Sequence, residues 1–272
     1  VVDFSLIDTM AAELNDTDFF TDTELATEIE HFLFANLVTR REYLEEVKLR
    51  RGLRRRLGQE QRAAVWRIRC EMVRRMEERL TYTKYYAREV ILQALRGERE
   101  VKGAEQPEAA ALRDVRYLFL DETQDLAACD LACLRELTRG YMIMGGDIDQ
   151  TLYGVTSPYA RAGMDLSGST RVLRTNFRNS CQIHDLASLF RKQAPAGTFE
   201  DTSDTYAFRE GPVPELYTAE SAAELQTLLL RKLSLFLEDL EYEPENICIL
   251  APRNREVDTI AGVADVLQIP AF

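Results

Sequence analysis

The chain has no apolar run of about 18 residues, which is the length that a membrane-spanning helix needs. It begins with Val1-Val2-Asp3-Phe4-Ser5, and it has neither an initiator Met nor the basic and apolar regions of a signal peptide. We therefore expect no membrane partner and a cytoplasmic location, with Val1 as an internal cut in a longer protein.

Cysteine and histidine are scarce in the chain. The five cysteines are odd in number and widely scattered, which argues against a disulfide framework. Cys129 and Cys133 lie four positions apart on an expected helix and could offer two zinc ligands, but the only histidines, His31 and His184, are far away in sequence. Since free Cys is commonly buried, we expect Cys129 and Cys133 to be small buried residues.

Lys and Arg are absent from residues 1–39, which carry nine acidic residues. Residues 40–99 then carry 18 Lys or Arg against nine Asp or Glu, a local charge of +9 in a chain whose net charge is −12. Charge is therefore segregated along the chain, and its position matters more than the total.

A helical period runs through the basic block and gathers four apolar residues on one face: Val65, Ile68, Met72 and Met76. The arginines of the block, which include Arg54, Arg55 and Arg56, then face solvent, where guanidinium groups can pair with phosphates and release counterions. Alternatively, these arginines pair with the acidic residues within 1–39. The charges alone favour neither phosphate binding nor this internal pairing.

No Gly-Lys pair occurs in the 272 residues. The phosphate-binding loop G-x-x-x-x-G-K-[ST] requires one, because its backbone N–H groups surround the phosphates, its Lys contacts the β- and γ-phosphates and its hydroxyl holds Mg²⁺. The chain by itself therefore lacks a complete nucleotide site of this kind.

With 46% hydrophobic residues, the chain can bury a core for one large or two modest domains. The first part reads as all-helical, with helices near 23–38, 40–51, 59–80 and 82–96. Gly97 and residues 102–107 break this pattern. Strands near 115–120, 141–145 and 171–174 then alternate with helices near 125–138, 147–153 and 178–192, which is typical of a largely parallel sheet. A second series begins after Gly211-Pro212, where strands near 215–217 and 247–250 precede helices near 219–238 and 254–267.

Polar residues follow the first three expected strands. They are Asp121-Glu122-Thr123-Gln124-Asp125, then residues 145–153 (Gly-Gly-Asp-Ile-Asp-Gln-Thr-Leu-Tyr), then Thr175-Asn176-Phe177-Arg178-Asn179. The carboxyl ends of strands are where α/β sheets place catalytic acids. In a nucleotide hydrolase, the first acid of an adjacent pair can hold Mg²⁺ through water, while the second accepts a proton from the attacking water.

Together these segments resemble the motifs of the UvrD/Rep-type superfamily 1 DNA helicases. The family's Walker B segment, DE-x-QD, is similar to residues 121–125, its third motif, GD-x-x-Q-x-I-Y, to residues 146–153, and its fourth, N-Y/F-R-S/N, to residues 176–179. Residues 247–254 and Ile269-Pro270 resemble the opening of the family's second motor domain. The order and spacing agree, and the resemblance covers roughly residues 110–272.

The resemblance implies an α/β fold with a RecA-like parallel sheet of the P-loop NTPase type. It assigns residues 1–108 to a helical insertion subdomain, 109–195 to the C-terminal half of a first RecA-like motor domain, and 196–272 to the beginning of a second. In the family the phosphate loop precedes the insertion, so we expect this chain to be an internal fragment that is inactive alone. A natural remnant without ATPase activity is the alternative.

The resemblance also implies ATP and Mg²⁺ as cofactors. Asp121 would hold Mg²⁺ through water, and Glu122 would be the general base that deprotonates the attacking water. Gln150 would sense the γ-phosphate, and Arg178 would reach the same phosphate as a charge neutraliser. Gln124 is expected to contribute to the same nucleotide site.

The implied partner is single-stranded or partly duplex DNA. Tyr153 would contact a base or sugar, although a core tyrosine is an equal alternative, and the family's insertion lies beside DNA, which favours phosphate contacts by the basic block. After Tyr153 the family's aromatic stacker and arginine are missing, because the sequence reads Gly-Val-Thr-Ser-Pro. Either Tyr159 supplies the ring from a shifted position, or the chain grips single strands more weakly.

Two functions therefore remain. The first is a motor in which ATP hydrolysis between two RecA-like domains drives movement along single-stranded DNA, and Glu122, Gln150 and Arg178 favour it. The second is a helicase-derived binding or remodelling module that acts through protein contacts, with residues 1–39 as a docking surface. The altered stacking segment favours the module.

Overall fold

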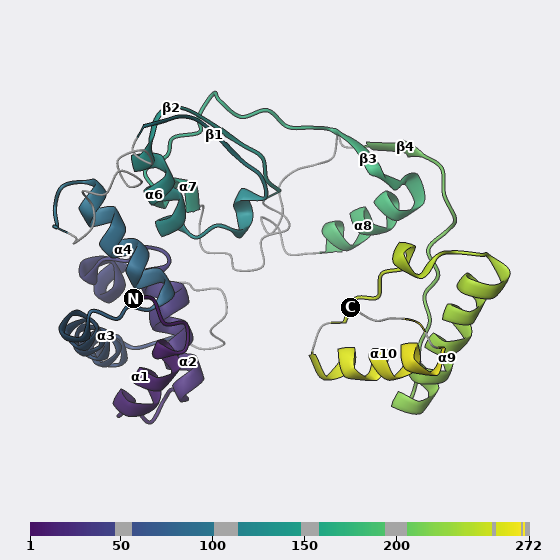
Figure 1. Ribbon diagram of the computed structural model, residues 1–272, viewed down its shortest axis with the longest axis horizontal. Helices are drawn as coiled ribbons and strands as arrows, with labels where there is room; N and C mark the ends of the chain where they lie inside the picture. Colours follow the sequence, from purple (N-terminus) through teal and green to yellow (C-terminus); the bar gives the residue numbers. More distant parts are fainter. Residues whose placement is uncertain are drawn as a thin grey trace. The chain divides into compact units, whose positions relative to one another are not determined.

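The computed structural model describes residues 1–46, 56–100, 114–147, 158–193, 206–251, 254–267 and 269 (Figure 1). The chain divides into two compact units. The first is Val1–Arg174 with Arg191–Thr205, and the second is Thr175–Phe190 with Tyr206–Phe272. The boundary after Arg174 falls inside the predicted domain 109–195.

The first unit begins with a group of helices. They are α1 (Leu6–Leu14), α2 (Asp22–Thr27), π-helical segments at Glu28–Phe34 and Glu42–Glu46, α3 (Gln59–Arg79) and α4 (Lys84–Leu95). Helix α2 begins at a capping box, in which Thr21 Oγ1 accepts from the N–H of Glu24 while the Glu24 carboxylate accepts from the N–H of Thr21. The predicted helical character of this part is confirmed, and α1 is an additional helix.

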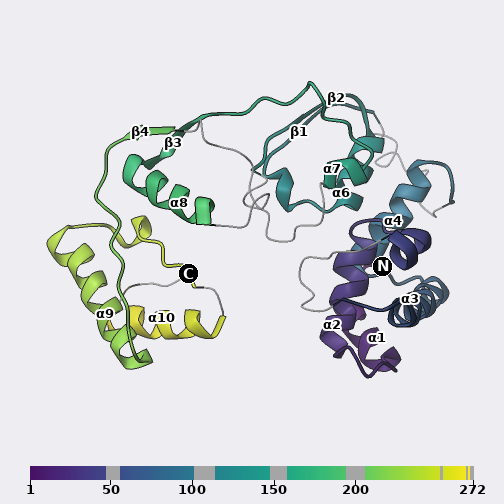
Figure 2. The same cartoon turned by 180° about the vertical axis from the view of Figure 1, so that it is seen from behind.

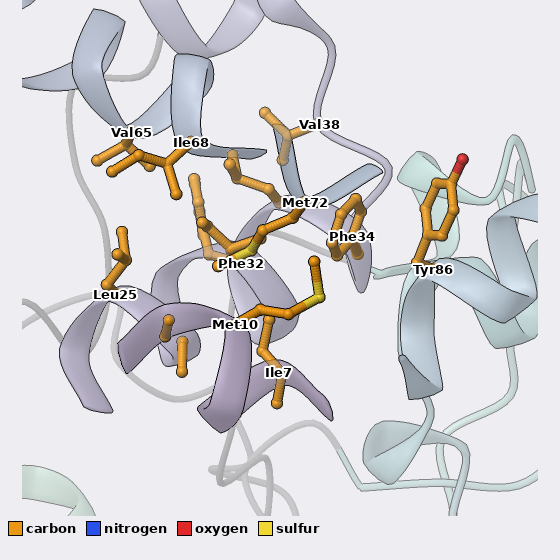
Figure 3. Packing of buried hydrophobic residues seen from close by; sticks show 14 of the residues in the cluster. Ile7, Met10, Leu25, Phe32, Phe34, Val38, Val65, Ile68, Met72 and Tyr86 are labelled. Atoms are coloured by element: carbon orange, nitrogen blue, oxygen red, sulfur yellow. The ribbon is translucent and has the colours of Figure 1, made fainter. Parts of the chain in front are cut away.

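These helices share one hydrophobic core, part of which Figure 3 shows. Helix α3 contributes the four apolar residues of the predicted face, each at most 1% exposed: Val65, Ile68, Met72 and Met76. They pack with side chains from the other helices, such as Met10 of α1, Leu25 of α2 and Tyr86 of α4. Burying a large apolar side chain stabilises the fold by about 1.5–3 kcal/mol, so this face holds α3 in place.

The α/β part of the first unit contains a parallel strand pair. Strand β1 (Val115–Leu120) pairs with β2 (Thr138–Met144), so that Tyr117 lies opposite Tyr141 and Leu120 opposite Met144. Helices α6 (Ala128–Leu137) and α7 (Pro158–Arg161) lie on one face of the pair (Figures 1 and 2). Leu131 of α6 and Tyr159 of α7 pack there with Leu120 and Met144.

The other face of this strand pair is apolar and exposed. Its side chains are Tyr117, Phe119, Tyr141 and Ile143, which are between 55% and 70% exposed. The rings of Tyr117 and Tyr141 stack with their centroids 5.9 Å apart. Alternation along each strand therefore puts apolar residues on both faces, because the inward set Leu118, Leu120, Met142 and Met144 is apolar too.

The second unit has its own parallel pair, β3 (Thr175–Ser180) with β4 (Tyr206–Arg209), and the helices α8 (Cys181–Gln193), α9 (Ala222–Ser234) and α10 (Asn254–Val266). The predicted strands at 171–174, 215–217 and 247–250 are wrong, because these residues form no ladder. The segment predicted to follow a strand, Asn176 to Asn179, is itself the strand. A strand requires a hydrogen-bonding partner, and β4 supplies it only from Thr175 onward.

The described residues thus form a mixed α/β structure with parallel strand pairs, as predicted at that level. The pairs β1–β2 and β3–β4 are separate, so the strand predicted near 171–174 does not extend the β1–β2 sheet, and the RecA-like sheet stays a prediction. Among the described helices, none has both the length and the apolarity that a membrane crossing requires.

Candidate functional site

The predicted acid pair lies at the carboxyl end of β1, beside the exit of β2. Gly145, the first residue after β2, donates its N–H to the carbonyl of Leu120 at 2.8 Å, and its own carbonyl accepts from the N–H of Thr123 at 3.0 Å. The parallel register brings the two strand ends together at one edge of the sheet. The turn after β1 and the turn after β2 therefore form one structure.

Asp121 and Glu122 both stand exposed at this edge. Oδ1 of Asp121 accepts from the N–H of Glu122 at 3.0 Å, and Glu122 adopts a left-handed backbone with φ 51°. A residue other than glycine rarely takes this conformation, and such strain concentrates at functional sites. The turn directs two adjacent carboxylates toward solvent, where a ligand can reach them.

Gln124 is buried beneath the pair, at 7% exposure, and its carboxamide makes two bonds. Nε2 donates to Oε2 of Glu122 at 2.7 Å, and Oε1 accepts from the N–H of Asp147 at 3.0 Å. In the reverse orientation of the amide, Oε1 would face the Glu122 carboxylate and Nε2 would face the N–H of Asp147, so neither hydrogen bond could form. The predicted nucleotide-site residue therefore holds the general-base candidate and the turn after β2 at the same time.

Thr123 is 1% exposed and binds the same turn through its hydroxyl. Oγ1 donates to the carbonyl of Gly145 at 3.0 Å and lies 2.8 Å from the hydroxyl of Tyr159. Since a threonine hydroxyl has one proton, Tyr159 is the donor in the second bond. Tyr159 is 8% exposed, so the prediction that its ring could stack on a base from a shifted position is wrong.

Gly146 is required by this close packing. A Cβ at this position would lie 2.7 Å from Oγ1 of Thr123 and 2.8 Å from Oε1 of Gln124, which is too close for carbon. The sequence motifs included Gly146, but they gave Thr123 no role and offered Tyr159 only as a base stacker. A hydroxyl residue between a Glu and a Gln was the available signal, because short polar side chains bind backbone groups in turns.

The acid pair fits a magnesium ion. Mg²⁺ keeps several water ligands and binds proteins through one or two carboxylates together with substrate phosphates, so it does not need a full set of protein ligands. Among the described residues, His, Cys, Asp and Glu form no group of three or more that could hold a metal. Two adjacent exposed carboxylates have the chemistry for an ion held largely by water and phosphate, and the Mg²⁺ role of Asp121 stays a prediction.

Arg178 belongs to the second unit, where it is exposed on β3. It was expected at the start of a helix, but α8 begins only at Cys181. The side chain of Asn176 accepts from the N–H groups of Arg178 and Asn179, both at 3.0 Å, and so fixes the local backbone. Gln150, Tyr153, Arg54 and Arg55 lie outside the described residues, and Arg56 is exposed.

Many arginines of the basic block pair with carboxylates. Two of them bind the acidic N-terminal part, since Arg67 contacts both carboxylate oxygens of Asp16 at 2.7 Å and Arg75 contacts Glu13 at 2.9 Å. Other pairs are Arg69–Glu89, Arg74–Glu71, Arg88–Asp130, Arg96–Glu136 and Arg99–Glu77. For Arg67 and Arg75 the structure therefore favours the alternative, pairing with residues 1–39, over phosphate contact.

Arg69 is buried among aromatic rings. Its guanidinium lies 4.8 Å from the ring centroid of Phe34 and 4.6 Å from that of Trp66, and its side chain is 13% exposed. Burial raises the pKa of its partner Glu89, although the charge of Arg69 acts in the opposite direction. Arg69 is therefore part of the helical core.

The two cysteines of α6 are buried, as predicted. Cys129 is fully buried, and Cys133, at 8% exposure, donates from Sγ to the carbonyl of Arg88 at 3.3 Å. Burial raises the pKa of the Cys133 thiol to about 11, and it raises the pKa of Cys129 as well. Because metals bind the thiolate, both residues are poor zinc ligands.

The strand ends present two adjacent exposed carboxylates, and carboxylate oxygens are groups that hydrated Mg²⁺ takes as ligands and that accept protons. A scan against models of known protein families and a search of curated proteins both find no match to this chain.

Proposed function

We propose that this chain is part of an ATP-dependent DNA helicase or translocase that couples ATP hydrolysis to movement on single-stranded DNA. The observation that carries the proposal is the exposed pair Asp121 and Glu122 at the end of a parallel strand, with the Glu122 carboxylate oriented by the buried Gln124. A general base must be held in one orientation to accept a proton from water. A surface acid pair without a catalytic role would not need a buried partner.

In the proposed mechanism Asp121 would hold Mg²⁺ through water, and the ion would neutralise charge on the phosphates of ATP. Glu122 has one oxygen occupied by Gln124 Nε2 and uses the other to orient the attacking water and take its proton. The resemblance assigns to Arg178 the neutralisation of charge that develops on the γ-phosphate, and to Gln150 the sensing of the same phosphate.

We assign the α/β part to a RecA-like fold. The parallel pairing of β1 and β2 supports this, and so does the apolar outer face formed by Tyr117, Phe119, Tyr141 and Ile143. Strands in parallel sheets are usually covered on both faces and read as continuous apolar runs. The β3–β4 pair and its helices would then belong at the start of a second RecA-like domain.

ATP turnover by the full-length protein tests the proposal. We expect hydrolysis that single-stranded DNA stimulates, and Arg178→Ala should lower kcat by about 10³-fold, as loss of an arginine finger does. Arg209→Ala is the matched control, because Arg209 is exposed on the paired strand β4. Equal activity of the two variants would remove Arg178 from the mechanism, and a full-length protein without ATPase activity would overturn the proposal.

A binding or remodelling module is the second candidate. It is supported by the burial of Tyr159, because this ring is then not available to replace the missing base stacker. Base stacking on an aromatic contributes roughly 1–3 kcal/mol per base, so its loss weakens the grip on a single strand. Protein binding by the full-length protein without DNA-stimulated ATPase activity would favour the module.

A further inference from the structure

The two residues after Glu122 tie the general-base candidate to the rest of the site. Gln124 bonds to the Glu122 carboxylate on one side and to the backbone of Asp147 on the other. The carboxamide is planar and buried, so it cannot rotate away from one partner without losing the other. The orientation of Glu122 is therefore linked to the position of Asp147.

Thr123 links the same turn to helix α7. Tyr159 donates to Oγ1 of Thr123, which in turn donates to the carbonyl of Gly145, and both hydroxyl-bearing side chains are buried. In a buried chain of hydrogen bonds each member orients the next, and an unpaired member is costly. The hydroxyl pair thus fixes the turn after β2, to which Gln124 also binds.

We propose that Gln124 and Thr123 are positioning residues for Glu122, with Tyr159 as the buried anchor of Thr123. Gln124 holds one oxygen of the Glu122 carboxylate and leaves the other for water, while Thr123 and Tyr159 keep the turn at Gly145 in the place that Gln124 requires. This inference rests on the proposed function, since it assumes that Glu122 accepts the proton.

The first test changes Gln124 to Glu in the full-length protein. The substitution keeps the size of the side chain but replaces the Nε2 donor with a negatively charged carboxylate oxygen, which then lies next to the Glu122 carboxylate. A neighbouring like charge raises the pKa of a carboxylate. We expect kcat to fall at least tenfold at neutral pH, the KM for ATP to change little, and the acid limb of the pH–kcat profile to move to higher pH.

The control for this variant is Gln182→Glu. Gln182 makes the same two kinds of bond, from Nε2 to Glu210 at 2.6 Å and from the N–H of Gly211 to Oε1 at 3.0 Å, in the second unit. The Gln182→Glu variant should leave the acid limb of the pH–kcat profile at the same pH. Gln124→Met, which removes both bonds at similar length, provides a second variant if Gln124→Glu does not fold, and it should lower kcat without moving the limb upward.

The second test concerns the hydroxyl pair. Thr123→Val and Tyr159→Phe each remove one hydroxyl and keep the shape of the side chain, so both should lower kcat several-fold. Thr123→Ser keeps the hydroxyl and should keep kcat near that of the wild type. Tyr86→Phe is the control, since its hydroxyl donates to Glu77 at 2.6 Å in the helical core. It should lower thermal stability as Tyr159→Phe does, but leave kcat unchanged.

The outcomes separate this inference from the proposed function. If the unmodified protein hydrolyses ATP and Glu122→Gln does not, the function stands. Wild-type kcat in folded Gln124→Glu or Gln124→Met would then overturn the positioning role, and so would an unshifted acid limb in Gln124→Glu. A kcat for Tyr159→Phe equal to that of Tyr86→Phe would overturn the role of the hydroxyl pair.

Discussion

Glu30 lies in the helical core and binds the start of α4. Its Oε1 accepts from the N–H of Tyr85 at 2.7 Å, within the first turn of that helix. A carboxylate favours this position because it accepts from an otherwise unpaired N–H and interacts with the helix dipole. Burial opposes the charge, however, and it is the largest influence on the pKa of Glu30, which is raised above its ordinary value.

The raised pKa predicts the effect of Glu30→Gln on stability. A folded state that binds the proton more tightly than the unfolded state is most favoured below the ordinary pKa of Glu, and this stability is lost as pH rises through the folded pKa. The glutamine keeps an acceptor for Tyr85 but has no charge to bury. We expect its free energy of unfolding to exceed that of the wild type at pH 7 and to match it more closely near pH 4, in urea titrations.

Glu30→Ala is the control, since it removes the acceptor as well as the charge. Leaving the Tyr85 N–H unpaired should cost about 1–3 kcal/mol at both pH values. A glutamine variant that is less stable than the wild type at pH 7 would show that the charge of Glu30 stabilises the helix start by more than its burial costs.

Helix α3 is the element that the sequence predicted best. Its apolar period gave the buried face, and Gly97, which has φ 73°, ends the helical part as predicted after α4. Helix α1 was missed because it is short and its apolar residues are separated from the basic block. It packs on α2, the next helix along the chain, and its apolar residues join the shared core, which a local pattern does not reveal.

The same limit explains the strand errors. The runs at 171–174 and 247–250 are apolar enough for strands, but a strand exists only where another one pairs with it. At the candidate site the acids and Gln124 could be read from their motif. The roles of Thr123 and Tyr159 could not, because the 2.8 Å contact between residues 36 positions apart depends on the packing of α7.

Ile68→Ala tests the importance of the α3 face. Ile68 is 1% exposed, and truncation to Ala removes buried contacts and leaves a cavity, so the free energy of unfolding should fall by about 2–5 kcal/mol. Glu60→Ala in the exposed first turn of the same helix should change it by no more than about 0.5 kcal/mol. Urea unfolding of the chain measures both, and a similar small effect for Ile68→Ala would contradict the burial of this face.

The charge of the whole chain, −12, conceals a basic block whose arginines are to a large extent paired internally. The pair of Arg67 with Asp16 is exposed on both sides, at 61% and 58% of the side chains, so it contributes only about 0.2–1 kcal/mol. A phosphate that binds such an arginine displaces the carboxylate at about this cost. We expect DNA to contact Arg54, Arg55 and Arg56, the residues that the sequence proposes.

Fluorescence anisotropy with single-stranded DNA tests this expectation. The chain should bind with a Kd of roughly 10⁻⁴–10⁻⁶ M, with little sequence preference and a steep loss of affinity on raising salt. Changing Arg54, Arg55 and Arg56 to Glu should abolish binding at low salt. The matched control changes Arg67, Arg74 and Arg96 to Glu, which alters the net charge equally but replaces arginines that are paired with carboxylates.

Equal binding by the two triple variants would mean that only net charge matters, and no binding by the unmodified chain at low salt would assign the block to a solvated or protein-facing surface. Either result would strengthen the remodelling module as the function of this chain.

Glu122→Gln in the full-length protein tests the central claim most directly, because the substitution removes the proton acceptor and keeps the size of the side chain. Steady-state ATP turnover and equilibrium nucleotide binding should be measured on the same preparation. The account predicts that binding is retained while turnover is lost far beyond tenfold. Turnover within about tenfold of the unmodified protein, a change of roughly 1.4 kcal/mol in the barrier, would show that Glu122 is not the general base.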